Sequence, residues 1–299
     1  MSLLITGSSG FIGRHLCAQL IAQQRSFEIL DRELLALSAF PDSADTVIHL
    51  AGKAHNRHAP YAEFYDANCQ YALNVASAAA AKGLKRFVYV SSSGVYGKSS
   101  SLTILTEESE LIPSENYSRS KIEGERQLKL LSEDLGFDLV IVRPALVYGA
   151  DAPGNIERLL RLIDKSPVIP IGNDTNKRSF AYISNFVEFL LVVAEHPNAA
   201  GKVFNYKDSD LSTHQLIDGF AHGMNKRPLT FSLPKRIWRV ILRSLGKRKL
   251  YEQLFENLIL DDSRAQQELD WQAPHTVEQA LTETGRKFCN VEINRPTDS

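Results

Sequence analysis

A glycine-rich turn at the start of the chain constrains its fold more than any other feature. A short apolar segment, Leu3 to Thr6, runs into three glycines, Gly7, Gly10 and Gly13, and an apolar-periodic helix follows at once. Gly7 would permit a tight turn, Gly10 would let the backbone approach a phosphate, and Gly13 would let the helix pack close on the strand. The helix N-terminus would add N–H donors and a positive dipole end. This order predicts a site for a dinucleotide pyrophosphate.

An acidic residue follows the second predicted strand and bears on the choice of dinucleotide. Residues 27–31 read as a strand ending in Asp31, 18 residues beyond Gly13. A carboxylate there accepts hydrogen bonds from the ribose hydroxyls and repels a 2′-phosphate, which favours NAD over NADP. Arg14 and Arg32 lie nearby in the sequence and favour NADP instead, since either could bind a 2′-phosphate.

Strands and helices alternate along the first half of the chain. This rhythm predicts an α/β fold, with a Rossmann-type, doubly wound parallel sheet and right-handed crossovers. We expect an NAD-binding Rossmann domain over residues 1–150, with a returning segment at about 177–207. The remaining segments of 151–299 are expected to form a smaller, mostly helical C-terminal substrate lobe. The expected helices include long ones at 61–82 and 115–135.

Composition narrows the class of protein. The 34 basic and 35 acidic side chains leave a formal charge of −1, so nothing indicates a nucleic-acid partner. No apolar run is long enough to span a bilayer and the chain enters its first strand directly, so a secretory signal peptide is not expected. Three scattered cysteines fit neither a disulfide framework nor a Cys-based zinc site. We expect a cytoplasmic protein with buried thiols and no metal site.

A tyrosine, a lysine and a serine run carry the expected chemistry. Tyr117 and Lys121 are four residues apart, so they share one helix face. A phenol titrates near pH 10, and a base working near neutrality needs its pKa lowered by about three units. Lys121, together with an oxidised nicotinamide ring, is the expected source of that shift. A serine from Ser91 to Ser93 would hydrogen-bond the same substrate oxygen. Tyr-x-x-x-Lys alone also occurs in solvated helix turns.

Together these residues resemble the extended short-chain dehydrogenase/reductase superfamily, specifically the NAD-dependent nucleotide-sugar epimerase/dehydratase family. The likeness spans residues 3 to about 185 and rests on the glycine turn, residues 49–52, Asn68, and residues 91–97, 117–121, 143–149 and 178–183. It implies that Ser92 holds the sugar hydroxyl, Tyr117 is the base and Lys121 orders the nicotinamide ribose. These three are the expected catalytic residues.

The resemblance and the motifs also give the expected binding residues. Cofactor contacts are expected from Gly7, Ser9, Gly10, Phe11, Ile12, Gly13, Asp31, Arg32, Leu50, Ala51, Gly52, Asn68, Tyr117 and Lys121. Substrate contacts are expected from Ser92, Ser93, His55, Asn155 and Arg178, the last of these on a nucleotide diphosphate. For Asn155 a helix N-cap is an equal alternative.

Several functions fit this pattern. The leading hypothesis is a 4-epimerase that acts on a UDP-hexose or UDP-N-acetylhexosamine through a transient 4-keto sugar. The alternative is a one-way 4-dehydrogenase or 4-keto reductase in bacterial polysaccharide sugar synthesis. A third hypothesis is a non-catalytic NAD-binding regulator, against which the intact Ser92, Tyr117 and Lys121 argue. Ser93 and Gly94 stand where 4,6-dehydratases carry an acid pair, which disfavours a dehydratase.

Two surfaces are expected to meet partners. Residues 235–249 hold seven basic side chains and no acid, with Ile237, Ile241 and Leu245 at helical spacing. The simpler interpretation is a lobe helix with a buried apolar face. The alternative is peripheral contact with a membrane surface or a lipid-linked sugar diphosphate. The family resemblance further implies a homodimer formed through the two long helices, 61–82 and 117–135.

Overall fold

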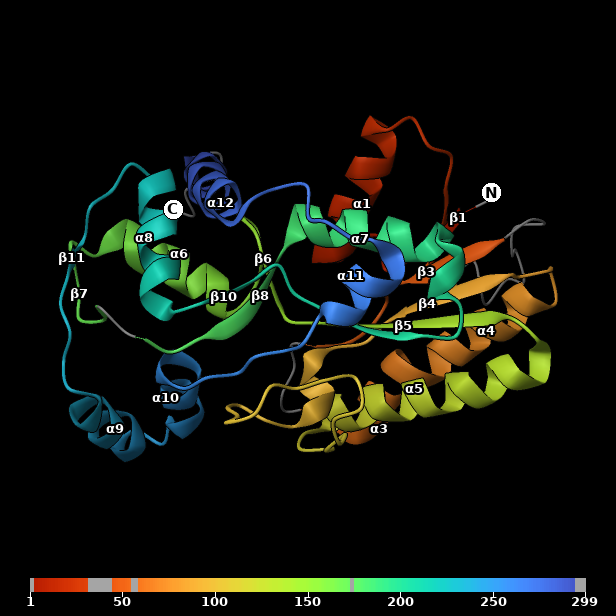
Figure 1. Cartoon of the computed structure of the whole chain (residues 1–299), viewed down its shortest axis with the longest axis horizontal. Helices are drawn as coiled ribbons and strands as arrows, with labels where there is room; N and C mark the ends of the chain where they lie inside the picture. Colours follow the sequence, from red (N-terminus) through yellow and green to blue (C-terminus); the bar gives the residue numbers. More distant parts are fainter. Residues whose placement is uncertain (1–2, 32–44, 55–58, 173–174, 294–299) are drawn as a thin grey trace.

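A parallel sheet forms the centre of the larger part of the molecule (Figure 1). The computed structural model describes residues 3–31, 45–54, 59–172 and 175–293. Within these residues the sheet has the strand order β2-β1-β3-β4-β5-β9, and every neighbouring pair is parallel. The strands are β1 (Leu3–Thr6), β2 (Glu28–Leu30), β3 (Thr46–His49), β4 (Arg86–Val90), β5 (Asp138–Pro144) and β9 (Val203–Tyr206).

The order of strands sets where a ligand binds. From β1 the chain passes to β2 on one side and then to β3 on the other side. The carboxyl ends of β1 and β3 are therefore a topological switch point, where open α/β sheets bind their ligands. The glycine turn directly follows β1 at this point. The predicted Rossmann-type architecture is confirmed.

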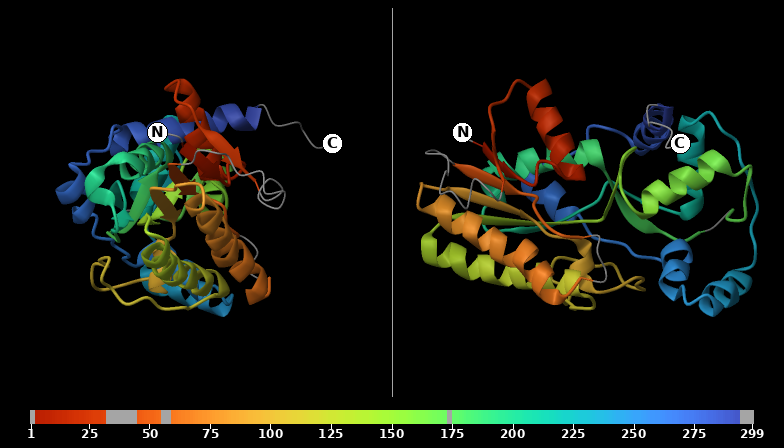
Figure 2. Two further views of the ribbon diagram at one scale, coloured as in Figure 1. Left: turned by 90° about the vertical axis from the view of Figure 1, so that its right-hand side faces the viewer. Right: turned by 180° about the vertical axis from the view of Figure 1, so that it is seen from behind.

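Helices cover both faces of this sheet, α1 and α7 on one and α4 and α5 on the other (Figures 1 and 2). The alternation of strand side chains explains the two layers. On β4, Val88 and Val90 pack in the core beneath α7, whereas Phe87 and Tyr89 pack in the core beneath α4. These helices are α1 (Phe11–Ala22), α4 (Tyr71–Ala80), α5 (Asn116–Leu135) and α7 (Ile183–Glu195).

The long helix expected at 61–82 is interrupted by a wide turn. The structure has α3 (Tyr61–Tyr65), a π-helical segment η1 (Asp66–Gln70), and then α4. At this turn the Asn68 carbonyl accepts a hydrogen bond of 2.6 Å from the Tyr89 hydroxyl. Such π segments often mark functional sites. A 3.6-residue apolar period cannot reveal one extra residue in a turn, so the sequence pattern predicts an uninterrupted helix.

The remaining elements form a mostly helical lobe beside the sheet (Figure 1). The segment expected to return to the sheet at about 177–207 begins with a strand, β8 (Arg178–Tyr182), which pairs with β6 (Leu146–Tyr148) and β10 (Ser209–Leu211) rather than with the large sheet. A two-stranded sheet joins β7 (Val168–Ile169) to β11 (Leu229–Thr230). The helices of the lobe are α6 (Asn155–Lys165), α8 (Thr213–Gly223), α9 (Lys235–Ser244), α10 (Arg248–Phe255) and α12 (Val277–Ile293). Helix α11 (Ser263–Leu269) lies instead beside the large sheet, where Arg264 donates to the Val203 carbonyl of β9 at 3.1 Å. None of the described helices is long and apolar enough to cross a membrane.

Candidate active site

The glycine turn brings strand and helix as close as the sequence predicts. Gly7 has φ of 72°, a left-handed conformation that favours glycine. A Cβ atom at Gly13 would lie 2.1 Å from the Gly7 carbonyl oxygen, so a side chain is sterically excluded there. Gly10 is the N-cap of α1 and gives it no side-chain cap. The first amide groups of α1 therefore keep their capacity to bind an anion.

The acid expected at the ribose lies beside this turn. Asp31 directly follows Leu30, which is paired with Thr6 on β1, and Asp31 is exposed. Arg14, which the sequence offered as a 2′-phosphate ligand, instead pairs with Asp151 at 3.0 Å and donates to the Ser9 carbonyl at 2.8 Å. Arg32 lies outside the described residues. Because Arg14 is already paired with Asp151, it no longer favours NADP over NAD.

Asp151 ties α1 to the loop after β6. Its carboxylate accepts hydrogen bonds from Arg14 and from His15 at 2.8 Å. Burial raises the pKa of Asp151, but the His15 and Arg14 hydrogen bonds outweigh that effect and bring the pKa to about 2. The pair keeps Arg14 occupied across the whole neutral range.

The predicted catalytic serine and tyrosine meet at the carboxyl end of β4. Ser92 is the N-cap of the 3-10 turn η2 (Ser93–Tyr96), and its hydroxyl accepts the Gly94 N–H at 3.0 Å. Tyr117, in the first turn of α5, is half-buried, and the neighbouring Ser92 side chain lowers the pKa of its hydroxyl. A Cβ atom at Gly94 would lie 3.2 Å from the Ser92 hydroxyl and 3.7 Å from the Tyr117 ring. The bare backbone of Gly94 therefore leaves room beside both hydroxyls.

Lys121 lies one turn further along α5, on the same face. Its side chain is buried, its ammonium donates to the Val90 carbonyl at 2.9 Å, and it lies 4.6 Å from the centre of the Tyr89 ring. Burial lowers the pKa of Lys121 to about 8, against an opposing effect of the Glu125 carboxylate. A Cβ atom at Gly52 would lie 3.4 Å from this ammonium, so the loop after β3 passes directly over it.

The expected effect of Lys121 on Tyr117 is absent in the protein alone. Loss of solvent around the Tyr117 hydroxyl raises its pKa above 10, and only the Ser92 hydrogen bond lowers it. The Lys121 ammonium is directed at the end of β4 rather than at the phenol. Any lowering of the Tyr117 pKa toward neutrality thus has to come with the cofactor and substrate.

Asn68, an expected cofactor contact, makes hydrogen bonds to the loop after β3 and to α5. It is fully buried, and its amide nitrogen donates to the Ser120 hydroxyl at 2.9 Å and to the Lys53 carbonyl at 3.1 Å. Its amide oxygen accepts the Lys53 N–H at 2.7 Å. Both N–H donors of the side chain are used in this way. Asn68 therefore fixes the loop after β3 against the helix that carries Tyr117 and Lys121.

A buried ion pair beneath this helix was not assigned a role from the sequence. Arg143, on β5, donates two hydrogen bonds to the Glu125 carboxylate, at 2.6 and 3.1 Å. The side chains are 5% and 4% exposed. Arg143 also donates to the Glu107 carbonyl and to the Tyr96 hydroxyl. A bidentate pair of this kind fixes α5 on the sheet and sets a negative charge one turn from Lys121.

The predicted substrate residues in the lobe lie around α10. Arg178 donates through Nη1 to the carbonyls of Ser99, Glu252 and Glu256 at 2.9 to 3.3 Å. Its Nε and Nη2 make no hydrogen bond with any residue in the described part of the chain. Asn155 is exposed, is the first residue of α6 and bonds Gln253 of α10; the N-cap itself is Gly154. His55 lies outside the described residues, and Ser93 begins η2 beside Ser92.

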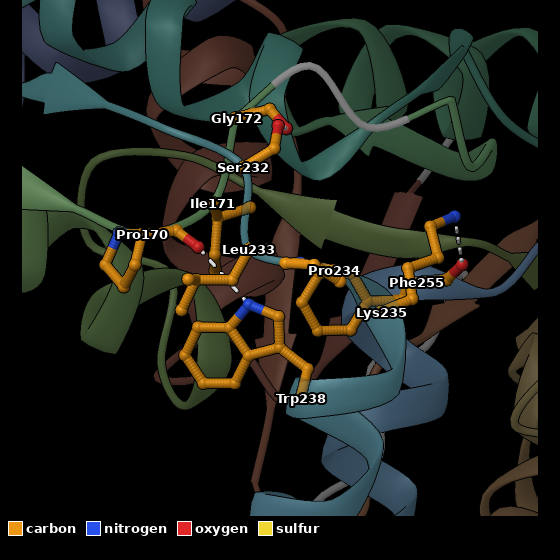
Figure 3. A pocket seen from close by; sticks show the side chains of 9 residues that line it. All are labelled: Pro170, Ile171, Gly172, Ser232, Leu233, Pro234, Lys235, Trp238 and Phe255. Carbon is orange, nitrogen blue, oxygen red and sulfur yellow. Dashed lines mark hydrogen bonds between the residues drawn. The ribbon is translucent and has the colours of Figure 1, made fainter.

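A cavity of about 320 Å³ adjoins α9 and the end of α10 (Figure 3). Its lining is mainly apolar, and the rings of Trp238 and Phe255 form one wall. The Trp238 indole donates to the Pro170 carbonyl at 3.2 Å, which holds the ring in place. The rest of the lining is Ile171, Gly172, Ser232, Leu233, Pro234 and Lys235. The sequence analysis did not predict this cavity.

Comparison with known protein families shows the family to which this chain belongs. Residues 3–206 match the model of the NAD dependent epimerase/dehydratase family. The protein belongs to this family. The sequence prediction of an NAD-dependent enzyme of this family is confirmed.

Known proteins resemble this epimerase/dehydratase family member along most of its length. A UDP-glucose 4-epimerase of Vibrio cholerae is 30% identical, with 96% of this chain and 95% of that protein aligned. An N-acetyl-alpha-D-glucosaminyl-diphospho-ditrans,octacis-undecaprenol 4-epimerase of Escherichia coli O157:H7 is 30% identical over 78% of this chain and 75% of its own. The solved structure of MoeE5 with UDP-glucose and NAD shares the fold, with a TM-score of 0.76, 24% identity, and 98% of this chain and 100% of that chain covered.

The residues of this family member fit its cofactor. The uncapped N-terminus of α1 suits the pyrophosphate, Asp31 suits the adenosine ribose, and the buried Lys121 ammonium suits the nicotinamide ribose. NAD, when bound, supplies the acceptor and donor of a hydride. The hydroxyl of Ser91, buried at the end of β4, has no hydrogen-bond partner among the described residues and is a further polar group at this edge.

Proposed function

We propose that the protein is an NAD-dependent 4-epimerase of a nucleotide sugar, either a UDP-hexose or a UDP-N-acetylhexosamine. The observation that supports this most is the meeting of the Ser92 and Tyr117 hydroxyls over the bare backbone of Gly94, one helical turn from Lys121. Two hydroxyls at one point can hold a single substrate oxygen while it changes between alcohol and carbonyl. The 4-epimerase relatives favour the sugar C4 as the reacting carbon.

Each of these residues has its own role in the proposed reaction. Tyr117 takes the proton from the sugar O4, and Ser92 donates a hydrogen bond to the carbonyl oxygen that results; the hydride that C4 loses would pass to bound NAD. When the 4-keto sugar has rotated in the site, Tyr117 returns the proton to O4, and the hydride would return from the reduced cofactor to the opposite face of C4. Lys121 positions the nicotinamide ribose, and Asn68 keeps the loop after β3 fixed against α5.

The lobe offers groups for the rest of the substrate. The two unengaged nitrogens of Arg178 suit a diphosphate, and α10, whose carbonyls hold Arg178, also borders the cavity lined by Trp238 and Phe255. Aromatic walls of this kind suit a planar ring. We assign the diphosphate to Arg178 and the uracil ring to this cavity. Asn155, exposed at the start of α6, stays a candidate contact to the sugar.

We further propose a homodimer that pairs through α3–α4 and α5. The two helical runs lie side by side on one face of the sheet, and no element among the described residues covers their outer surfaces (Figures 1 and 2). Leu130, on the outer surface of α5, is 52% exposed.

Replacing Tyr117 by Phe tests the mechanism. The phenyl ring keeps the packing but has no hydroxyl, so turnover of UDP-glucose or UDP-N-acetylglucosamine is expected to fall by roughly 10² to 10⁴. Binding of NAD, followed by absorbance of the purified protein and by quenching of tryptophan fluorescence, should stay near that of the unaltered chain. Tyr61→Phe on the neighbouring helix α3 is the matched control and should retain full turnover. Unchanged turnover in Tyr117→Phe would disprove the assigned base.

The cofactor requirement separates epimerase from oxidoreductase. An epimerase recycles its NAD, so turnover should proceed with the cofactor carried through purification. Product formed only in step with added NAD(H) or NADP(H) would replace the epimerase by a 4-dehydrogenase or 4-keto reductase.

A further inference from the structure

Helix α9 exposes a row of apolar side chains at the end of the lobe. Ile237, Val240, Ile241 and Leu245 are 44%, 69%, 40% and 60% exposed. The first three follow the i, i+3, i+4 spacing that places side chains on one helix face. The simpler interpretation of the sequence, a lobe helix with this face buried, is therefore wrong. We call Ile237, Val240, Ile241 and Leu245 the apolar row.

The helix is seated on the lobe by a different face. Leu242 is 5% exposed, and Trp238 packs against Phe255 with its indole bonded to the Pro170 carbonyl. Leu242 and Trp238 are again four residues apart and form their own stripe. The contacts that hold α9 in place therefore do not involve the apolar row. No described segment of the chain covers it.

The charged side chains of residues 235–249 are all basic, with seven Lys or Arg and no Asp or Glu. Two of the seven, at the start of α10, form ion pairs with acids outside this stretch. Arg236, Arg243 and Lys247 are exposed and form no ion pair with a described residue. On a helical projection Arg236 and Arg243 fall on the stripe next to the apolar row. A helix with an apolar face flanked by uncompensated basic side chains is complementary to an anionic lipid surface.

We propose that α9 and the start of α10 form a peripheral membrane-docking face for anionic phospholipid. The apolar row would enter the boundary between headgroups and acyl chains, and Arg236, Arg243 and Lys247 would contact the lipid phosphates. The position of α9 permits this, because it lies at the end of the lobe away from the six-stranded sheet (Figures 1 and 2). A flat surface can reach α9 without meeting the glycine turn or Tyr117.

The docking face also adjoins the proposed substrate site. Trp238 and Lys235 of α9 line the cavity beside α10, and the α10 carbonyls hold Arg178. Docking would therefore set the proposed diphosphate site close to the bilayer. Membrane binding itself rests only on the apolar row and its charges, and its test needs no substrate.

Sedimentation of the full chain with lipid vesicles tests the proposal. The protein is expected to sediment with phosphatidylcholine vesicles that contain phosphatidylglycerol, to do so less as NaCl is raised, and to stay in solution with phosphatidylcholine alone. The triple variant Ile237→Ser/Val240→Ser/Ile241→Ser should lose the binding. Arg236→Gln/Arg243→Gln/Lys247→Gln should weaken it on the order of tenfold or more, since each cation near the surface contributes to attraction.

Matched controls carry equal changes on other faces. Ile21→Ser and Leu130→Ser replace exposed apolar residues of α1 and α5, and Lys129→Gln/Arg158→Gln/Lys165→Gln removes three exposed cations elsewhere. All should bind vesicles as the unaltered chain does. Circular dichroism of each variant checks folding.

Either of two results would overturn the proposal. One is no binding of the unaltered chain to anionic vesicles at moderate salt. The other is binding that the α9 triple variants leave unchanged. If vesicles do not bind and the apolar triple variant instead changes the mass seen in sedimentation velocity, the apolar row is an interface between subunits.

Discussion

The side chains that matter most around the catalytic helix follow one spacing. Tyr117, Lys121 and Glu125 are each four residues apart on α5 and so share a face. The sequence predicts the first two because a tyrosine can act as a base when a nearby lysine lowers its pKa. The same spacing could have pointed to Glu125, but its buried partner Arg143 comes from a strand 18 residues further on, and that pairing is set only by the tertiary packing.

Lys121 should give the reaction a basic limit. Its pKa is lowered from an ordinary 10.5 to about 8 by burial, so its ammonium is lost as pH rises through about 8. If the ammonium positions the cofactor ribose, kcat/KM should fall above about pH 8 with that apparent pKa. The unfolded chain keeps this proton up to pH 10.5, so the free energy of unfolding should rise with pH between 8 and 10.5. A pH–rate profile flat to pH 10 would contradict the role of Lys121.

Replacing Glu125 by Gln should move this limit. The Glu125 carboxylate favours the Lys121 ammonium, so its loss should lower the pKa of Lys121 and shift the basic limb of kcat/KM to lower pH. Glu123→Gln, which removes a half-buried acid paired with Arg126 on the same helix, should leave the limb in place. Glu125→Gln also leaves Arg143 unpaired, at a cost of about 3 to 5 kcal/mol in the free energy of unfolding. Urea unfolding measures that cost. The pH dependence of kcat/KM, measured on the folded variant, gives the pKa of Lys121.

At the scale of elements, the sequence predicts what period and composition determine. The strands of the large sheet, the glycine turn and α5 all appear where apolar runs and glycine spacing place them. The π segment at Asp66–Gln70 and the exposed row on α9 do not follow from the pattern. A helical apolar period shows that residues share a face, but the partner that covers the face comes from other elements.

The three glycines of the turn should respond differently to a methyl group. A Cβ atom at Gly13 would lie 2.1 Å from the Gly7 carbonyl oxygen, whereas at Gly10, with an ordinary φ of −72°, it would lie 3.3 Å from that atom. Gly13→Ala should therefore lower the free energy of unfolding by roughly 1 to 3 kcal/mol or more. Gly10→Ala should change it little but weaken NAD binding, because the methyl group would stand where the pyrophosphate approaches.

Two measurements check this pair. Urea unfolding without cofactor gives the stabilities, and titration with NAD gives the affinities. Equal loss of stability in both variants would mean that Gly10, too, is needed for packing. Unaltered NAD affinity in a folded Gly10→Ala would place the pyrophosphate elsewhere.

At the scale of the molecule, the sequence predicts a sheet with a helical lobe but not how the lobe is assembled. β8 has the apolar pattern of a strand and joins β6 and β10 instead of the large sheet, because the edge next to β5 is taken by β9. Competition of this kind between distant segments leaves no local signal. Dimer formation depends in addition on the surfaces that remain exposed once the chain has folded.

The outer surface of α5 should carry the contact between subunits. Arg119, Glu123, Arg126 and Leu130 follow one stripe of α5 on the side away from the sheet. A dimer would sediment with a mass of about twice the chain's 33.4 kDa. Leu130→Glu places a charge in this surface and should yield the single-chain mass, since burying an unpaired charge in an interface costs several kcal/mol. Ile21→Glu, an equal change on α1 across the sheet, should remain dimeric, as should the apolar triple variant of α9. A single-chain mass for the unaltered protein at micromolar concentration would refute the dimer, and a dimer untouched by Leu130→Glu would move the interface off α5.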